Sequence, residues 1–208
     1  FGTNLLSQVA RNLDHFMTAN MLPPITAKHF VAYYNSVSRI NNMIDVPSLA
    51  AADVLFPKNV QVLQSEGIEK VKYYFEKMVA TIIAIILPLS LIIFLFPDLI
   101  LFIIAGPEYH AAAPILQITM LFGLVRPLSY QFGSTLDAIG KPRVNFIANA
   151  VFFVTGVLLN YILINLFGGM GPAYATAVNA VISLVVMILI LKKYMRIELS
   201  KILRYIGE

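Results

Sequence analysis

The amino-acid sequence predicts an all-α fold, a polytopic membrane bundle of six transmembrane helices. Long apolar runs follow one another along the 208 residues, and the lysine and arginine residues fall mainly on alternate connections between these runs. Hydrophobic residues make up 59% of the chain and charged residues 12%, with a mean hydropathy of +0.78. This composition leaves too little polar surface for a soluble globule of the same length.

Each predicted helix is long enough to cross the hydrocarbon core of a bilayer, which is roughly 30 Å thick and takes about 20 helical residues. The six runs are 2–20, 31–56, 78–96, 113–137, 144–166 and 172–191. Pro23 and Pro24 end the first run, because proline lacks an N–H group and disfavours helical geometry in the residue before it. Turns rich in glycine and proline separate the later runs, at 106–114, 140–142 and 168–172.

The stretch 57–77 lies between the second and third helices. It begins at Pro57 and mixes charged with aliphatic residues. This pattern predicts a cytoplasmic amphipathic linker within the bundle that forms a short helix, either lying on the membrane surface or solvated.

Positive charge is strongly asymmetric between the two sides of the predicted bundle. Eleven lysine and arginine residues lie in the 57–77 linker, the 138–143 connection and the tail, whereas Lys28 is alone on the opposite side. Because cytoplasmic loops carry the excess of these residues, we expect the C-terminus in the cytoplasm. The net charge of +4 is then explained by loops facing anionic lipid head groups, and no nucleic-acid partner is expected.

Polar and charged residues nevertheless line one face of several predicted helices. A charge in the hydrocarbon core costs at least about 2.5 kcal/mol, so such residues are candidates for a transport pathway. We expect substrate binding at Arg11, Arg39, Arg126, Asn4, Gln8 and Asn42. We expect proton or ion coupling among Asp14, His15, Asp45 and Asp53.

The chemistry of these residues favours an anionic cargo. The three intramembrane cations are all arginines, which stay charged when partly desolvated and present a planar fork to phosphate or carboxylate oxygens. The alternative is structural, in which Arg11 neutralises Asp14 and Arg39 neutralises Asp45 without binding any cargo. The number of uncharged polar residues on the same faces favours a hydrated cavity.

Motifs of enzymes are missing from the sequence, so catalytic residues are not expected. It contains no phosphate-binding glycine loop, no metal-ligand spacing and no nucleophile elbow, and we expect neither a cofactor nor a metal site. There is no cysteine, and therefore no disulfide framework. The chain begins at Phe1 within its first helix, which suggests a fragment whose N-terminal part is missing.

Several short motifs resemble those of oligosaccharide flippases, the polysaccharide-export branch of the multidrug/oligosaccharidyl-lipid/polysaccharide exporter superfamily. The most specific is the turn Gly106-Pro107-Glu108-Tyr109-x-x-Ala112-Ala113-Pro114-x-Leu116. The others are Arg11-x-x-Asp14, Ala32-Tyr33, Leu55-Phe56-Pro57, Gly140-Lys141-Pro142 and Gly168-x-x-Gly171-Pro172-Ala173-x-Ala175-Thr176. Pro172 departs from this pattern, because alanine is common at its position. The resemblance covers the whole chain and matches the C-terminal lobe of the family.

The resemblance implies that residues 1–208 form one MATE-like lobe of six helices, paired across a central cavity with an N-terminal lobe of the same chain. It implies a transporter in a bacterial or archaeal cell membrane. This transporter would move a polyprenyl-pyrophosphate-linked oligosaccharide to the outer leaflet by alternating access, for surface polysaccharide export. On this view the pyrophosphate would bind to Arg11, Arg39 and Arg126. Two alternatives stay open, a cation-coupled multidrug extruder of the same superfamily and a non-transporting scaffold or accessory protein that pairs with itself.

Overall fold

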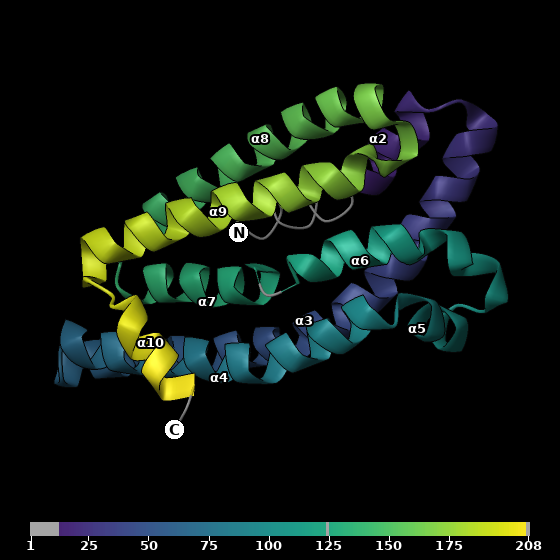
Figure 1. Cartoon of the computed structure of the whole chain (residues 1–208). Helices are drawn as coiled ribbons and strands as arrows, with labels where there is room; N and C mark the ends of the chain where they lie inside the picture. Colours follow the sequence, from purple (N-terminus) through teal and green to yellow (C-terminus); the bar gives the residue numbers. More distant parts are fainter. Residues whose placement is uncertain (1–12, 124, 207–208) are drawn as a thin grey trace.

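The computed structural model describes residues 13–123 and 125–206, and every regular element in this part of the chain is helical. The helices form an elongated bundle with its turns gathered at two ends (Figure 1). In chain order the elements are α2 (Leu13–Met21), α3 (Pro24–Ser65), α4 (Ile68–Leu95), α5 (Pro97–Ile104), the 3₁₀ helix η1 (Pro107–Ala112), α6 (Ala113–Leu121), α7 (Val125–Ala138), α8 (Pro142–Phe167), the 3₁₀ helix η2 (Gly168–Met170), α9 (Gly171–Met195) and α10 (Leu199–Ile206). The all-α class predicted from the sequence is confirmed.

Helix α3 is much longer than the predicted run 31–56, with 42 residues. Pro24 occupies its first turn, where a missing N–H group is not needed, and the helix continues through Pro47 and Pro57. Residues 57–65 therefore end α3 and residues 68–77 begin α4, so the 57–77 linker does not form a separate short helix. Gly67, with φ of +82°, reverses the chain between them.

The predicted run 113–137 is divided in the structure. Helices α6 and α7 meet at a bend of 40° between Leu121 and Val125. Gly123 lies at this break, and a Cβ atom there would approach Ser90 Oγ of α4 at 3.0 Å. The break therefore lets the chain pass close to α4.

Two helical stretches in the described part of the chain are long and apolar enough to cross a membrane, Ile68–Leu95 and Pro142–Met195. The second, of 54 residues, contains both α8 and α9, which lie side by side and run in opposite directions (Figure 1). Helices η1–α6 and α7 qualify as a third if the bent pair counts as one span. The structure thus shows a helical membrane bundle, and six separate crossings stay a prediction.

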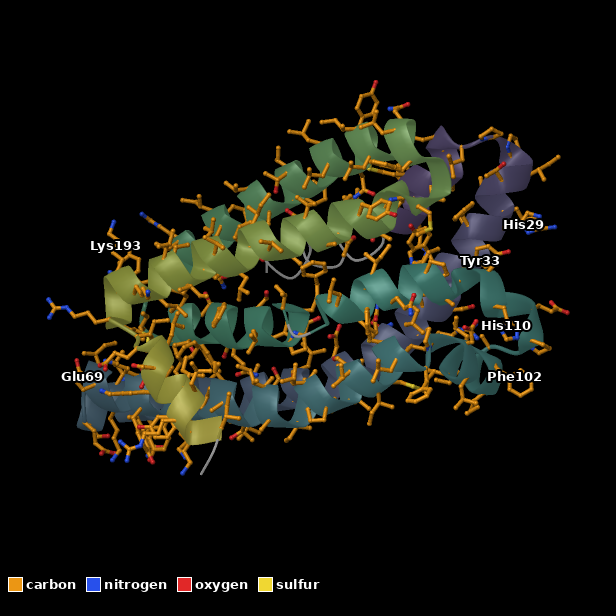
Figure 2. All side chains as sticks on the ribbon, viewed as in Figure 1. His29, Tyr33, Glu69, Phe102, His110 and Lys193 are labelled. Atoms are coloured by element: carbon orange, nitrogen blue, oxygen red, sulfur yellow. The ribbon has the colours of Figure 1, made fainter. Side chains whose placement is uncertain are left out.

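The two ends of the bundle differ in charge. The α3–α4 turn, the α7–α8 connection and α10 lie at one end, and the α2–α3 turn, α5 and η2 lie at the other (Figure 1). Figure 2 shows Glu69 and Lys193 at the first end, and His29 and His110 at the second. The connections that carry eleven of the chain's cations therefore meet at a single end, as the alternation in the sequence predicts.

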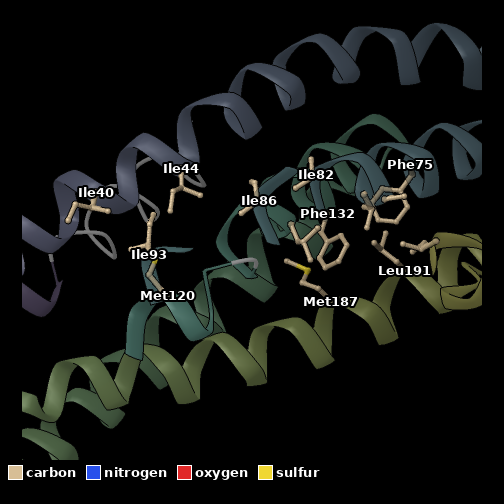
Figure 3. Packing of buried hydrophobic residues seen from close by; sticks show 14 of the residues in the cluster. Ile40, Ile44, Phe75, Ile82, Ile86, Ile93, Met120, Phe132, Met187 and Leu191 are labelled. Atoms are coloured by element: carbon tan, nitrogen blue, oxygen red, sulfur yellow. The ribbon is translucent and has the colours of Figure 1, made fainter. Parts of the chain in front are cut away.

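The apolar core runs along the bundle between α3, α4, α7 and α9. Phe75 of α4 is fully buried beside Phe132 of α7, with ring centroids 5.5 Å apart. Met187 and Leu191 of α9 pack into the same region (Figure 3). This core fixes the helices whose polar faces form the candidate site.

Candidate functional site

A partly buried carboxylate is held where α2, α8 and α9 meet. Asp14 of α2 accepts a hydrogen bond from Thr176 Oγ1 at 2.8 Å and one from Asn160 Nδ2 at 3.2 Å. Asn160 is 2% exposed, and its side-chain oxygen has no hydrogen-bond partner within the described residues. A carboxylate, a hydroxyl group and a side-chain amide therefore meet at one point between three helices.

A cavity of about 260 Å³ lies beside this carboxylate, between α2, α8 and α9 on one side and α3, α6 and α7 on the other. Its polar lining includes Asp14, Asn41, Arg126, Asn149, Asn160 and Thr176. Apolar residues such as Phe152, Phe153 and Met187 complete the wall. A cavity of this size, with polar and apolar walls, is large enough for several water molecules or a small polar group.

Arg126 borders this cavity at the start of α7 and pairs with Asp45 of α3, with Nη2 and Oδ2 2.8 Å apart. The Asp45 side chain is 5% exposed, whereas that of Arg126 is 35% exposed. Tyr130, one turn further along α7, donates a hydrogen bond to the same carboxylate oxygen at 3.3 Å. Two side chains of α7 therefore hold the Asp45 carboxylate in place.

The α3–α7 contact continues as a polar seam below this ion pair. Gln131 Nε2 donates to the backbone carbonyl of Ser48 at 2.8 Å, and Ser134 Oγ donates to that of Ala52 at 3.2 Å. Side chains on α7 thus bond directly to the backbone of α3. These bonds hold the two helices in register.

His15 and Tyr34 connect the site to the end of the bundle that carries few cations. His15 Nε2 lies 3.2 Å from Ser38 Oγ, and its ring meets Tyr34 edge to face at 6.3 Å between centroids. The Tyr34 hydroxyl donates to the carbonyl oxygen of Gly169 and accepts from the N–H of Ala173, both at 2.9 Å. Helix α3 is thereby bonded to the α8–α9 turn.

A second polar surface lies on the outside of α3. Asn35, Arg39, Asn42 and Asp53 are all exposed. At about 100° per residue they share one narrow stripe of the helix. Arg39 forms no ion pair with any residue that the structure describes. A stripe with an unpaired arginine is unsuited to hydrocarbon and therefore suits water or a polar partner.

The structure separates the residues that the sequence grouped together. Asp14 and Arg126 line the cavity, while Arg39, Asn42 and Asp53 lie on the exposed α3 stripe. Asn4, Gln8 and Arg11 lie outside the described residues. The structure pairs Asp45 with Arg126 and not with Arg39, the partner considered from the sequence.

Sequence reasoning did not foresee that Asn160 and Thr176 hydrogen-bond to Asp14. Asn160 shares a helix face with Asn145 and Gly156, and Thr176 belongs to the 168–176 motif. The polar face of α8 is the feature of the sequence that could have indicated a role for Asn160. The contact itself depends on how three helices meet.

These features define a helical membrane protein with a buried polar site inside the bundle. The model of the MatE family matches residues 1–162, so the chain belongs to this family. No solved structure matches the chain.

Two archaeal proteins are similar in sequence. The "uncharacterized membrane protein MJ1068" of Methanocaldococcus jannaschii is 28% identical over 153 residues, which cover 73% of this chain and 30% of that protein. The "probable low-salt glycan biosynthesis flippase Agl15" of Haloferax volcanii is 26% identical over 161 residues, which cover 77% of this chain and 34% of that protein. The chain thus spans about a third of the length of the curated relatives that it matches.

Proposed function

We propose that the chain is the C-terminal six-helix lobe of a transporter that flips a polyprenyl-pyrophosphate-linked oligosaccharide from the cytoplasmic to the outer leaflet. The MatE family and a relative named as a probable glycan biosynthesis flippase support this class of function. In this proposal the missing lobe is part of the same chain, and the cation-rich end faces the cytoplasm of a bacterial or archaeal cell.

The exposed polar stripe of α3 is the observation that carries the proposal. Arg39, Asn42 and Asn35 are solvent-accessible on a helix whose other faces pack against α2, α4 and α7. Arg39 has no ion-pair partner among the described residues, and lipid is a poor neighbour for such a guanidinium, so in this proposal the stripe faces the central cavity between two lobes. Arg39 there offers a fork to the pyrophosphate, and the asparagines offer amides to sugar hydroxyls.

The direct test is Arg39→Ala in the intact transporter, with Arg143→Ala as the control at the exposed start of α8. We expect Arg39→Ala to abolish surface polysaccharide while membrane insertion stays normal, and Arg143→Ala to change neither. Arg39→Lys keeps the charge without the planar fork and should retain partial export. Normal export by Arg39→Ala would argue against the cargo site and favour the scaffold alternative.

Asp14 is the residue that binds the proton or sodium ion whose movement drives export in this proposal. The hydroxyl oxygen of Thr176 lies 2.8 Å from the Asp14 carboxylate, and hard cations prefer oxygen ligands of this kind. Asp45 already has Arg126 as its counter-ion, so it suits a structural role better. Export driven by an imposed ion gradient should stop in Asp14→Asn and persist when Asp53, on the exposed stripe, is replaced by Asn.

The multidrug-extruder alternative is tested with the same variants. An extruder of cationic drugs would lose drug resistance in Asp14→Asn and keep it in Arg39→Ala, since the arginine repels such a cargo. The flippase proposal predicts that surface polysaccharide responds to both variants and that drug resistance responds to neither.

A further inference from the structure

A group of lysine and tyrosine side chains gathers at the cation-rich end of the bundle, away from the cavity. We call it the basic tyrosine cluster, and it consists of Lys58 of α3, Lys70, Tyr73, Tyr74 and Lys77 of α4, and Tyr205 of α10. Lys58 Nζ lies 4.2 Å from the centroid of the Tyr74 ring. Lys70 and Lys77 lie 5.7 Å and 5.9 Å from that of Tyr73. The Tyr73 ring also meets Tyr205 edge to face at 5.9 Å.

The positive charge of this cluster is poorly compensated. Lys70 has Glu66 at 3.5 Å, with both side chains about half exposed. Within the described residues, Lys58 and Lys77 have no carboxylate within 4 Å.

The carboxylates of Glu198, which is exposed, and Glu76, which is buried, are already engaged near the cluster. Glu198 pairs with Lys72 at 2.7 Å and with Lys201 at 2.9 Å. Glu76 accepts the backbone N–H of Glu198 at 2.8 Å. Several ammonium groups thus converge on two rings, and an external anion would relieve their mutual repulsion.

The cluster lies where α4 changes from charged to uncharged residues. Lys77 is the last charged residue of α4, and the helix from Met78 to Leu95 is uncharged. Tyrosine rings concentrate at such transitions, with the ring in the apolar layer and the hydroxyl in water. Leu203 of α10 is 70% exposed beside the cluster, as expected for a helix that rests on a membrane surface.

We propose that the basic tyrosine cluster binds the phosphate of an anionic membrane lipid in the leaflet at this end. The ammonium groups of Lys58, Lys70 and Lys77 supply charge and hydrogen-bond donors, and the tyrosine hydroxyls supply further donors. The acyl chains then lie along the exposed apolar side of α4, where Ile85 and Leu89 are 63% and 42% exposed. A soluble acidic protein could contact the lysines but would leave this apolar side of α4 uncovered, so the surface favours a lipid.

The test is a titration of the purified intact protein with phosphatidylglycerol and with phosphatidylcholine, followed by native mass spectrometry. The variant replaces Lys58, Lys70 and Lys77 with Gln. A matched control replaces Arg143, Lys192 and Lys193 with Gln, which removes the same charge from the same end. A thermal unfolding curve in detergent establishes that each variant is folded.

We expect the cluster variant to lose affinity for phosphatidylglycerol by about five-fold per lysine, on the order of 100-fold in all. The control variant should lose less than ten-fold, and phosphatidylcholine should bind all three proteins weakly and alike. Unchanged affinity in the cluster variant, or an equal loss in the control, would overturn the proposal, because binding would then follow net charge alone.

Discussion

Arg126 of α7 and Asp45 of α3 form an ion pair in the interior of the bundle, with 2.8 Å between Nη2 and Oδ2. The pair joins the broken α6–α7 segment to the longest helix of the chain. Asp45 is almost fully buried, and Arg126 reaches the cavity. If α7 moves along α3, this ion pair must therefore break, unless the Arg126 side chain changes its conformation.

Arg126→Ala should lower the free energy of unfolding by roughly 3 kcal/mol, since it leaves the Asp45 carboxylate buried without its counter-ion. The double variant Arg126→Met with Asp45→Leu removes both charges and should recover most of that loss. Denaturant unfolding in detergent measures both. If the double variant were as unstable as the single one, an uncompensated charge would not be the cause.

Tyr34→Phe should destabilise the protein by about 1 to 3 kcal/mol, because two buried backbone groups lose their hydrogen-bond partner. These groups are the carbonyl of Gly169 and the N–H of Ala173. Differential scanning calorimetry measures the effect. Tyr33→Phe is the control, because the Tyr33 hydroxyl forms no hydrogen bond with a described residue, and it should leave the melting temperature unchanged.

Gly169 and Gly171 should differ in how they tolerate alanine. A Cβ atom at Gly169 would collide with the Phe30 ring, which can move, whereas one at Gly171 would lie 2.5 Å from backbone atoms of Ile164. We expect Gly171→Ala to lower the melting temperature more. Adding Phe30→Ala should rescue Gly169→Ala and leave Gly171→Ala unrescued, and rescue of both would contradict the packing described here.

The docking of α10 should depend on pH through Glu198. Hydrogen bonds from Lys201 and Lys72 lower the pKa of this carboxyl group from 4.5 to about 2. Because the pKa is lower in the folded state, the stabilisation is complete above pH 4.5 and is lost as the pH falls towards 2.

A spin label on Leu203→Cys, in a chain that otherwise lacks cysteine, reports this docking. Its mobility should rise between pH 4.5 and 2. In the Glu198→Gln background it should be high at every pH. A label equally immobile across this range would show that Glu198 does not hold the helix.

The orientation of the bundle can be tested with single cysteines. Ser65→Cys, at the α3–α4 turn, and Glu108→Cys, in η1, lie at opposite ends (Figure 1). In intact cells an impermeant maleimide should label the cysteine at position 108 and not the one at position 65. The reverse pattern would contradict a cytoplasmic cation-rich end.

Some helices were predictable because glycine and proline residues mark where they begin or end. Helices α8 and α9 lie within a few residues of the predicted runs 144–166 and 172–191, since glycine and proline turns mark their ends. The continuation of α3 through Pro57 was not foreseen, because proline usually ends a helix and only its surroundings decide otherwise. The break before Val125 was not foreseen either, because Gly123 is a single glycine in an apolar stretch and such a glycine more often indicates close helix packing than a helix end.

The candidate site was predictable in its composition and not in its pairings. The sequence indicated that Asp14, Asp45 and Arg126 are candidates for a polar site inside the bundle, because charge is costly in apolar helices. It could not indicate that Arg126 rather than Arg39 meets Asp45, since that choice depends on the packing of α7 against α3. The same holds for the contact of Thr176 with Asp14.

The length of α3 has a consequence for how the protein stands in its membrane. Its 42 residues span about 63 Å, at 1.5 Å per residue. Even a tilt of 40° leaves about 48 Å along the membrane normal, against a hydrocarbon core of roughly 30 Å. Part of this helix therefore lies outside the hydrocarbon core, and an antibody fragment raised against that part would give the protein a visible landmark for particle alignment in electron microscopy.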